Sequence, residues 1–317
     1  MSGQALPPPP GFRVGHWTHA EARTGCTVVI PPAGTTAGVD VRGGGTGTRE
    51  IELLGPLANA EGPTAVLLTG GSAFGLGAAD GVSRWLEEHG FGRPTPTGHV
   101  PLVSAAVIYD LAEGDASVRP GPEQGYAACE AAREGVPERG PVGGGAGAMV
   151  GKSLGHERAT RAGVGYAAAR VPDGPTVAAV AICNAAGDVI GAEGEVLGGP
   201  HRDDGGLARS ADLIPGMSAP PYTVRPGEST TLVCVCTDAP LDKRGCGIVA
   251  RMATAGVARA VDPVFSPVDG DVIFCLASGE DLPAPPSPEA SWALMTVGTV
   301  GATVTAEAIR DSVVAKA

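Results

Sequence analysis

The sequence has few aromatic residues and little positive charge. Phenylalanine, tryptophan and tyrosine make up 4% of the 317 residues, and 22 basic against 34 acidic side chains give a formal net charge of −12. Nucleic acids and anionic membrane surfaces are bound through clustered lysine and arginine. We therefore expect no nucleic acid and no membrane as a partner, and a small-molecule or peptide substrate fits better.

The cysteines and the apolar runs exclude several further classes. There are seven cysteines without a CxxC spacing, which predicts neither a disulfide framework nor a zinc site, and we expect no metal or other cofactor. Residues 1–10 lack the basic and apolar regions of a signal peptide. The uncharged run 290–306 is shorter than the roughly 20 residues that span a bilayer, so it predicts a buried helix. These features favour a cytoplasmic protein.

Glycine and proline are abundant instead, with 50 and 29 residues. That share borders on the composition of disordered chains. However, 43% of the residues are hydrophobic and the glycines stand between alanine and valine runs, which indicates close backbone packing and tight turns. The length is ample for a large core.

Apolar periodicity predicts a mixture of strands and helices, with a glycine- and proline-rich linker at 193–229. By themselves these patterns establish only a mixed α and β class. The predicted strands are 26–30, 65–69, 163–171, 176–184, 231–237 and 271–276, and the predicted helices are 76–90, 123–134, 241–260 and 288–315.

The linker runs directly into an apolar strand that begins with hydroxyl residues. If the chain is cut between Ser229 and Thr230, the new α-amino group, with an ordinary pKa of about 8, can take the proton of the Thr230 hydroxyl. Thr230 is therefore the predicted nucleophile of a self-cleaving amidase. Thr231 is a rival that faces the other side of the strand, and a plain β-branched strand start is the structural alternative.

Two carboxylates flank Gly270 at the start of another predicted strand. In extended backbone, Asp269 and Asp271 can point to the same side. Such a pair can orient an ammonium group, position hydrogen bonds of the nucleophile or raise the pKa of one member. A solvated turn is the alternative, because Asp-Gly is a common turn dipeptide.

A single lysine, Lys152, follows the glycine-rich run 143–151. A cation in a glycine-walled site can stabilise an oxyanion or pair with Asp269 or Asp271. A phosphate-binding loop is disfavoured, because that motif needs glycine where Ala146 stands. A surface lysine remains the simple alternative.

Donors at strand ends complete the candidate site. The Tyr109 hydroxyl and the Asn184 amide are suitable oxyanion donors, although each can equally be a satisfied structural group. Gly71 and Ser72 form a predicted helix-start turn that walls a substrate pocket. Ser72 only loosely resembles a nucleophile elbow, because Phe74 stands where that motif needs glycine.

Several motifs in a fixed order resemble the S58 peptidase family of N-terminal nucleophile hydrolases, which contains the β-aminopeptidases and the endo-type nylon oligomer hydrolase. The resemblance covers nearly the whole chain. Its motifs are 11–16, 68–76, 106–110, 237–240 and 268–271.

The resemblance implies an α+β fold, a four-layer αββα sandwich. It also implies self-cleavage of one structural domain into a larger subunit, 1–229, and a smaller subunit, 230–317, and a homo-oligomer, a tetramer of cleaved heterodimers. The matching positions make Thr230 the nucleophile and Tyr109 and Asn184 the oxyanion donors. Lys152 lines the site, and the Asp-Gly-Asp sequence is typical of members with a threonine nucleophile.

The implied substrates are linear oligoamides such as 6-aminohexanoate (nylon) oligomers. Three alternatives stay open: a β- or D-aminopeptidase on short peptides, an acyltransferase similar to the ornithine acetyltransferases, and an uncleaved binding protein. The last alternative depends on Ser229, since the nylon hydrolase pattern has asparagine there, although glycine also occurs in the family.

Overall fold

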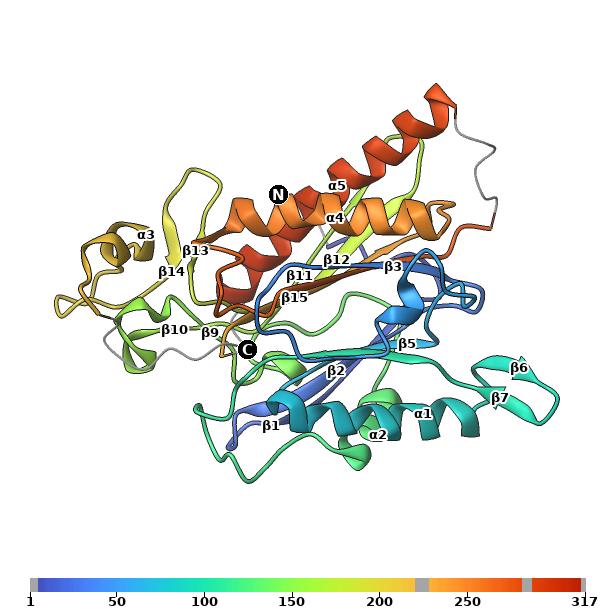
Figure 1. Ribbon diagram of the computed structural model, residues 1–317, viewed down its shortest axis with the longest axis horizontal. Coiled ribbons are helices and arrows are strands. Elements are labelled where there is room, and N and C mark those ends of the chain that lie inside the picture. Colours follow the sequence, from blue (N-terminus) through green and yellow to red (C-terminus); the bar gives the residue numbers. More distant parts are fainter. Residues whose placement is uncertain (1–4, 220–227, 281–286, 315–317) are drawn as a thin grey trace.

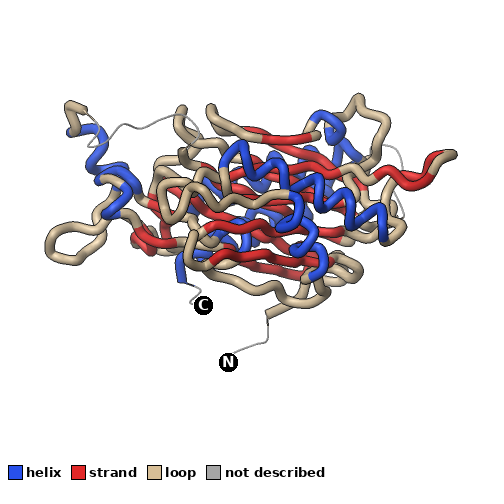
Figure 2. The backbone as a smooth tube through the Cα atoms, turned by 90° about the horizontal axis from the view of Figure 1, so that it is seen from below, coloured by secondary structure: helices blue, strands red, loops and turns tan. Residues whose placement is uncertain are grey.

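Two mixed five-stranded sheets lie face to face between two pairs of helices in the computed structural model, which describes residues 5–219, 228–280 and 287–314. One pair of helices covers the outer face of each sheet, so the layers follow in the order helix, sheet, sheet, helix (Figure 1). The view from below shows helices lying across the strands (Figure 2). The predicted α+β class and αββα sandwich are confirmed.

The first sheet packs against helices α1 (Ala78–Glu88) and α2 (Pro122–Glu130). Along its strands the side chains alternate: Val28 and Leu67 belong to the cluster beneath the helices, whereas Val29 and Leu68 belong to the core between the sheets. This period of two is what a strand with an apolar layer on each face requires. The strands are, in order across the sheet, β1 (Arg13–His19), β2 (Thr24–Ile30), β5 (Ala65–Thr69), β8 (Val103–Val107) and β4 (Thr48–Arg49).

The second sheet packs against helices α4 (Lys243–Ala260) and α5 (Pro288–Val314). Its middle strand, β15, is antiparallel to β12 and parallel to β17, and every residue of β15 is buried. Burial on both faces explains why this strand is continuously apolar after its first two threonines. The strands are, in order across the sheet, β11 (Val164–Arg170), β12 (Thr176–Asn184), β15 (Thr230–Thr237), β17 (Val272–Ala277) and β3 (Thr36–Val41).

Both helices of this layer touch the backbone of the second sheet at glycines. A Cβ atom on Gly38 of β3 would collide with the backbone of Gly247 in α4, and one on Gly165 of β11 with the carbonyl group of Ala308 in α5. Only glycine permits such an approach. This is the close backbone packing that the composition predicts.

The linker predicted over 193–229 is loop and turn for much of 193–219, but short regular elements interrupt it; 220–227 lie outside the described residues. Strand β14 (Val196–Gly198) pairs with β13 (Asp188–Ile190), and helix α3 (Ser210–Leu213) is fixed by Asp188, whose carboxylate accepts bonds from the Ser210 amide and hydroxyl groups at 2.5 Å each. The remaining short strands are β16 (Val261–Asp262), which also pairs with β13, β9 (Met149–Val150) with β10 (Thr160–Arg161), and β6 (Arg93–Thr95) with β7 (Gly98–Val100).

Removing the Ser210 hydroxyl should loosen this segment. Asp188 is fully buried, and burial raises its pKa to about 6 against the effect of its Ser210 bonds. In Ser210→Ala one carboxylate oxygen and the Ser153 hydroxyl lose a buried partner, so we expect the free energy of unfolding to fall by about 1–3 kcal/mol. Urea unfolding measures this, and Ser218→Ala, at an exposed position, is the control that should stay within about 0.5 kcal/mol.

Helix α5 is, by length and composition, apolar enough to cross a membrane. Half of its most apolar stretch is buried in the fold, and it packs along α4, β11 and β12. The helix is therefore a core helix over its second half. The burial predicted for 290–306 is found on one face from Val297 onward, whereas residues 290–296 are exposed or half-exposed. Its first turns protrude from the body, where the Trp292 side chain is 67% exposed.

Candidate active site

Thr230 is the first residue of the middle strand β15, and its side chain is buried. Its hydroxyl group donates a hydrogen bond of 2.6 Å to the carbonyl oxygen of Ser229, the residue whose carbonyl carbon self-cleavage would attack. The backbone N–H of Gly270 donates to the same oxygen at 2.8 Å. This contact follows from the parallel pairing of β15 and β17. The same register continues on the N-terminal side of both strands, where Ser229 and Asp269 form a parallel bridge. The Ser229 carbonyl is thus held by two donors.

The paired aspartates lie beside this peptide bond and are both buried, but they hold different groups. Asp271 accepts from the backbone N–H of Thr231 at 2.5 Å. Asp269 accepts from the Ala186 N–H at 3.2 Å and from both the amide and the hydroxyl group of Ser266. Asp269 therefore already accepts three structural hydrogen bonds, and Asp271 is the carboxylate that contacts strand β15.

One oxygen of Asp271, Oδ2, is buried without a hydrogen-bond partner among the described residues. Burial, and to a smaller extent the charge of Asp269, raises the pKa of Asp271 to about 7. An orphaned carboxylate oxygen with a pKa near neutrality is suited to accept a proton or an ammonium group. The expectation that one aspartate raises the pKa of the other agrees with this arrangement.

Lys152 is almost completely buried and faces the residues that precede the nucleophile. Its ammonium group donates to the Glu228 carbonyl at 3.0 Å, the Ser229 hydroxyl at 3.3 Å, and the backbone and side-chain oxygens of Asn184 at 2.9 and 3.1 Å. Burial lowers its pKa to about 8, against smaller raising effects of Glu113 and Asp269. Within the described chain Lys152 makes no salt bridge, so the pairing with an aspartate that we considered is not found.

Asn184 lies opposite Thr230 in the antiparallel register of β12 and β15. Its side-chain oxygen accepts from the Met149 N–H as well as from Lys152, which fixes the amide orientation. Its amide nitrogen donates to the Tyr109 carbonyl at 3.1 Å and to the Glu228 carbonyl at 3.4 Å. In the intact chain Asn184 thus contacts the carbonyl group one residue before the scissile one.

Tyr109 reaches the site through its backbone carbonyl. Its hydroxyl group makes no hydrogen bond with another described residue, so the geometry of the intact chain does not use it as an oxyanion donor. Gly71 and Ser72 follow β5, and both have positive φ, of 80° and 53°. Asp110 holds this turn by accepting from the Gly71 N–H at 2.7 Å. The Ser72 N–H donates to the Ile108 carbonyl, next to Tyr109, whose own carbonyl accepts from Asn184.

Two functional features escaped the sequence reasoning. The Gly270 N–H donates directly to the Ser229 carbonyl, yet the sequence identifies it only as the glycine between two aspartates. Asp110 is a buried carboxylate that binds Gly71 and the Thr24 hydroxyl, and burial raises its pKa. Its position directly after an apolar strand was the available signal.

The glycine-rich run before Lys152 is not a phosphate-binding loop. Residues 142–150 are all buried, and Gly144 is packed between the Leu68 carbonyl and the Ile182 side chain. The P-loop alternative is therefore wrong, because no space for phosphate remains around these amide groups. Among the residues described, no group of three or more histidine, cysteine, aspartate or glutamate side chains could hold a metal ion.

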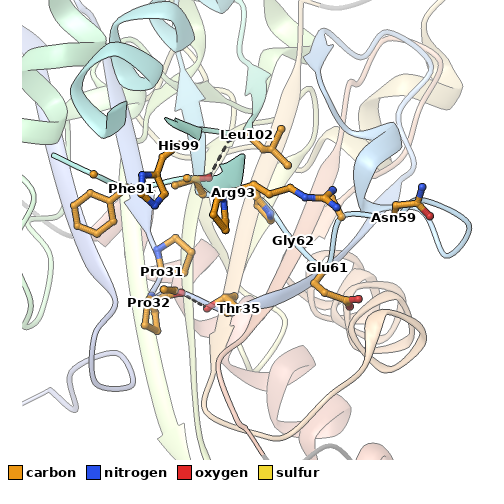
Figure 3. Close-up of a pocket in the computed structure, with 18 residues that line it drawn as sticks. Pro31, Pro32, Thr35, Asn59, Glu61, Gly62, Phe91, Arg93, His99 and Leu102 are labelled. Carbon is orange, nitrogen blue, oxygen red and sulfur yellow. Dashed lines mark hydrogen bonds between the residues drawn. The ribbon is translucent and has the colours of Figure 1, made fainter. Parts of the chain in front are cut away.

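A cavity of about 540 Å³ lies at the opposite end of the first sheet (Figure 3). It is lined by residues that precede β5 and β8, such as Thr64 and Leu102, whereas the Thr230 site lies beyond the carboxyl ends of these parallel strands. Figure 3 shows Phe91 and His99 on one side of this cavity and Pro32 and Thr35 on another. None of the predicted site residues lines it.

The raised pKa of Asp271 should make stability depend on pH. The folded chain binds this proton more tightly than the unfolded chain, whose aspartate pKa is about 3.9. The contribution of Asp271 to the free energy of unfolding is thus complete below about pH 4 and is lost as the pH rises to about 7, at up to about 1.4 kcal/mol per pH unit.

Urea unfolding between pH 4 and 7 tests this, in a Thr230→Ala background that keeps the chain intact. Asp271→Asn should flatten the loss of stability with rising pH. Asp188 contributes a slope of the same sign in both proteins, so only the difference between them counts. Identical slopes would contradict the assignment.

The fold and this arrangement of groups agree with an amide-bond hydrolase. Residues 9–317 match the family described as Peptidase family S58, and the chain belongs to that family. The family and the hydrolase class predicted from the motifs are confirmed.

Known relatives fall into two groups by name. The chain is 38% identical to an uncharacterized aminopeptidase of Mycobacterium tuberculosis, over 94% of this chain and 90% of the relative. It is 29% identical to the 6-aminohexanoate-oligomer endohydrolase of Paenarthrobacter ureafaciens, over 96% and 83%.

Solved structures agree on the fold. The β-aminopeptidase of a Burkholderia species aligns with a TM-score of 0.69 and 23% identity, over 98% of this chain and 88% of that chain. The L-aminopeptidase D-Ala-esterase/amidase of Ochrobactrum anthropi, described as a variant of the Ntn hydrolase fold, aligns with a TM-score of 0.69 and 19% identity, over 98% and 87%.

Proposed function

We propose that the chain is a self-processing amide hydrolase that uses Thr230 as its N-terminal nucleophile and cleaves linear oligoamides such as 6-aminohexanoate oligomers. The observation that carries the proposal is the buried Thr230 hydroxyl, 2.6 Å from the Ser229 carbonyl oxygen, whose other donor is the Gly270 N–H. A peptide bond held in this way, next to a buried cation and an orphaned carboxylate oxygen, is suited to an attack from within the chain.

In the first step the Thr230 oxygen bonds to the Ser229 carbonyl carbon, the bond from that carbon to the Thr230 nitrogen breaks, and the hydroxyl proton moves to the nitrogen. Water then hydrolyses the ester, giving a chain 1–229 and a chain 230–317 within one structural domain. The freed amine is the base for later turnovers. Lys152, Asn184, Asp269 and Asp271 orient the reacting groups, and Tyr109, Gly71 and Ser72 line the approach.

Denaturing mass spectrometry with N-terminal sequencing tests this directly. We expect a fragment that begins Thr230-Thr231-Leu232, accompanied by release of monomer or dimer products from 6-aminohexanoate oligomers. A stable intact chain of 317 residues would remove the proposed base and favour the uncleaved binding protein.

A second candidate is an aminopeptidase on short peptides, β- or D-amino-acid peptides included. It is favoured by the relative from Mycobacterium tuberculosis, which is more similar to this chain than the oligomer hydrolase and is named as an aminopeptidase. Both candidates use the same nucleophile, so they differ in whether the substrate carries a free amino group.

The proposal includes a cytoplasmic location and a tetramer of cleaved heterodimers. All seven cysteines are buried and unpaired, which supports a reducing compartment. Size-exclusion chromatography with light scattering measures the assembly.

A further inference from the structure

The intact chain contains its own acyl group in the active site. Residues 228 and 229 precede the nucleophile and lie on the side that the acyl part of a substrate would occupy. Two consecutive carbonyl oxygens of this segment are held: that of Ser229 by Gly270, and that of Glu228 by Lys152 at 3.0 Å and Asn184 at 3.4 Å. The site therefore has donors for two successive carbonyl groups.

The chemistry connects this segment to the substrate. The ester that self-cleavage forms joins the Ser229 carbonyl carbon to the Thr230 oxygen. An acyl-enzyme formed from an amide substrate is the same ester with the substrate's acyl group, and its leaving amine takes a proton. In self-cleavage, the acyl group moves from the Thr230 nitrogen to the Thr230 oxygen. Because both atoms belong to one residue, the acyl group stays beside the donors Gly270, Lys152 and Asn184. After hydrolysis and departure of the segment, these donors face the substrate.

We infer, on the basis of the proposed function, that Lys152 and Asn184 bind the amide carbonyl of the substrate that lies one residue before the scissile carbonyl. Gly270 binds the scissile carbonyl itself. The site therefore selects substrates whose amino group on the acyl side of the scissile bond is itself acylated. The substrate class is an internal amide bond of an oligoamide or N-acylated peptide. A buried lysine and a side-chain amide fixed by Met149 form a rigid pair of donors for such a carbonyl.

A free amino group fits this place poorly. In an aminopeptidase substrate, an ammonium group would stand where the Ser229 nitrogen stands. Since Lys152 is 3.0 Å from the Glu228 carbonyl oxygen, that position lies within about 5 Å of the lysine ammonium group. Two cations at this separation repel each other in a buried site. Asp269 already accepts three hydrogen bonds, and Asp271 bonds to the backbone of Thr231, on the other side of the scissile bond. Glu113, whose charge also acts on Lys152, is paired with Arg23 and His156.

The test uses three chromogenic probes on the purified, self-cleaved protein. N-acetyl-seryl-p-nitroanilide supplies a carbonyl in the place of that of Glu228, and seryl-p-nitroanilide has a free amine. N-ethyl-seryl-p-nitroanilide has the carbon skeleton of the acetyl probe without its oxygen and controls for apolar size. We expect kcat/KM for the acetyl probe to exceed both others by at least tenfold.

The outcomes separate this inference from the proposed function. A self-cleaved protein that hydrolyses the free-amine probe equally well or faster overturns the carbonyl subsite, and Thr230 hydrolysis stands. A self-cleaved protein that hydrolyses none of the probes also overturns it, because the acetyl probe copies the segment that the site accepts. Absence of a Thr230 fragment by mass spectrometry refutes the proposed function itself, and the inference with it.

Discussion

The Thr230→Ala variant is expected to remain a single chain of 317 residues and to lose amide hydrolysis. The substitution removes the hydroxyl group that lies 2.6 Å from the Ser229 carbonyl oxygen, so neither the ester nor the N-terminal nucleophile can form. Removal of a catalytic nucleophile lowers kcat by about 10⁴-fold or more in hydrolases of comparable design. Intact mass measures cleavage, and product release from 6-aminohexanoate oligomers measures hydrolysis.

Two controls separate the nucleophile from the fold. Thr230→Ser keeps the hydroxyl group and should restore cleavage at the same bond. Thr231→Ser keeps the neighbouring hydroxyl group and should leave the cut before residue 230. A Thr230→Ala chain that still yields a fragment, for example one beginning at Thr231, would show that the rival hydroxyl is the nucleophile.

Most central elements could be predicted because they are fully buried. The predicted strands 65–69 and 176–184 coincide with β5 and β12, whose residues are continuously apolar and end at turns. The edge strands β1 and β3 were missed, since their partly exposed residues interrupt the apolar pattern. Apolar periodicity detects strands that are buried. An edge strand is half exposed, and it is defined by its hydrogen bonds to the neighbouring strand, which the sequence does not display.

Helix ends were set by contacts that the sequence does not display. The predicted helix 123–134 stops at Glu130, because the backbone of Arg133 pairs with Val14 of β1 in both directions. The predicted helix 76–90 begins as a 3-10 turn over Ser72–Gly77, and α1 starts at Ala78. In the first case tertiary pairing overrides a local helical pattern, and in the second the 3-10 turn leads directly into the α-helix.

The candidate site was predictable in its residue types but not in its connections. Thr230, Lys152, Asn184, Asp269 and Asp271 all lie around one peptide bond, as the motifs predict. Their roles depend on register between distant strands: antiparallel pairing places Asn184 opposite Thr230, and parallel pairing brings Gly270 to Ser229. Such pairings arise only in three dimensions, which is why the backbone donor was missed. The donor role of the Tyr109 hydroxyl stays a prediction, since in the intact chain Tyr109 meets Asn184 through its backbone carbonyl.

At Gly270, the glycine between the two aspartates, a single added methyl group should strongly slow self-cleavage. A Cβ atom on Gly270 would lie 2.7 Å from the Gly45 carbonyl oxygen and 2.9 Å from the Thr230 hydroxyl oxygen. Both distances are too short for a carbon atom, so the Gly270 backbone, the Gly45 backbone or the Thr230 side chain must shift in Gly270→Ala, and each shift disturbs the contacts around the Ser229 carbonyl. Misplacement of reacting groups by about 1 Å costs roughly 10²-fold.

We therefore expect Gly270→Ala to self-cleave at least about 100-fold more slowly than the parent chain, as measured by the fraction of intact chain over time. Circular dichroism and the unfolding midpoint establish that the variant is folded. Gly77→Ala is the matched control, because it has an ordinary helical φ of −61° and no heavy atom within 4 Å of the added carbon, so it should cleave at the parental rate. A folded Gly270→Ala chain that cleaves as fast as this control would contradict the requirement for the present arrangement of the Gly270 N–H, the Thr230 hydroxyl and the scissile carbonyl.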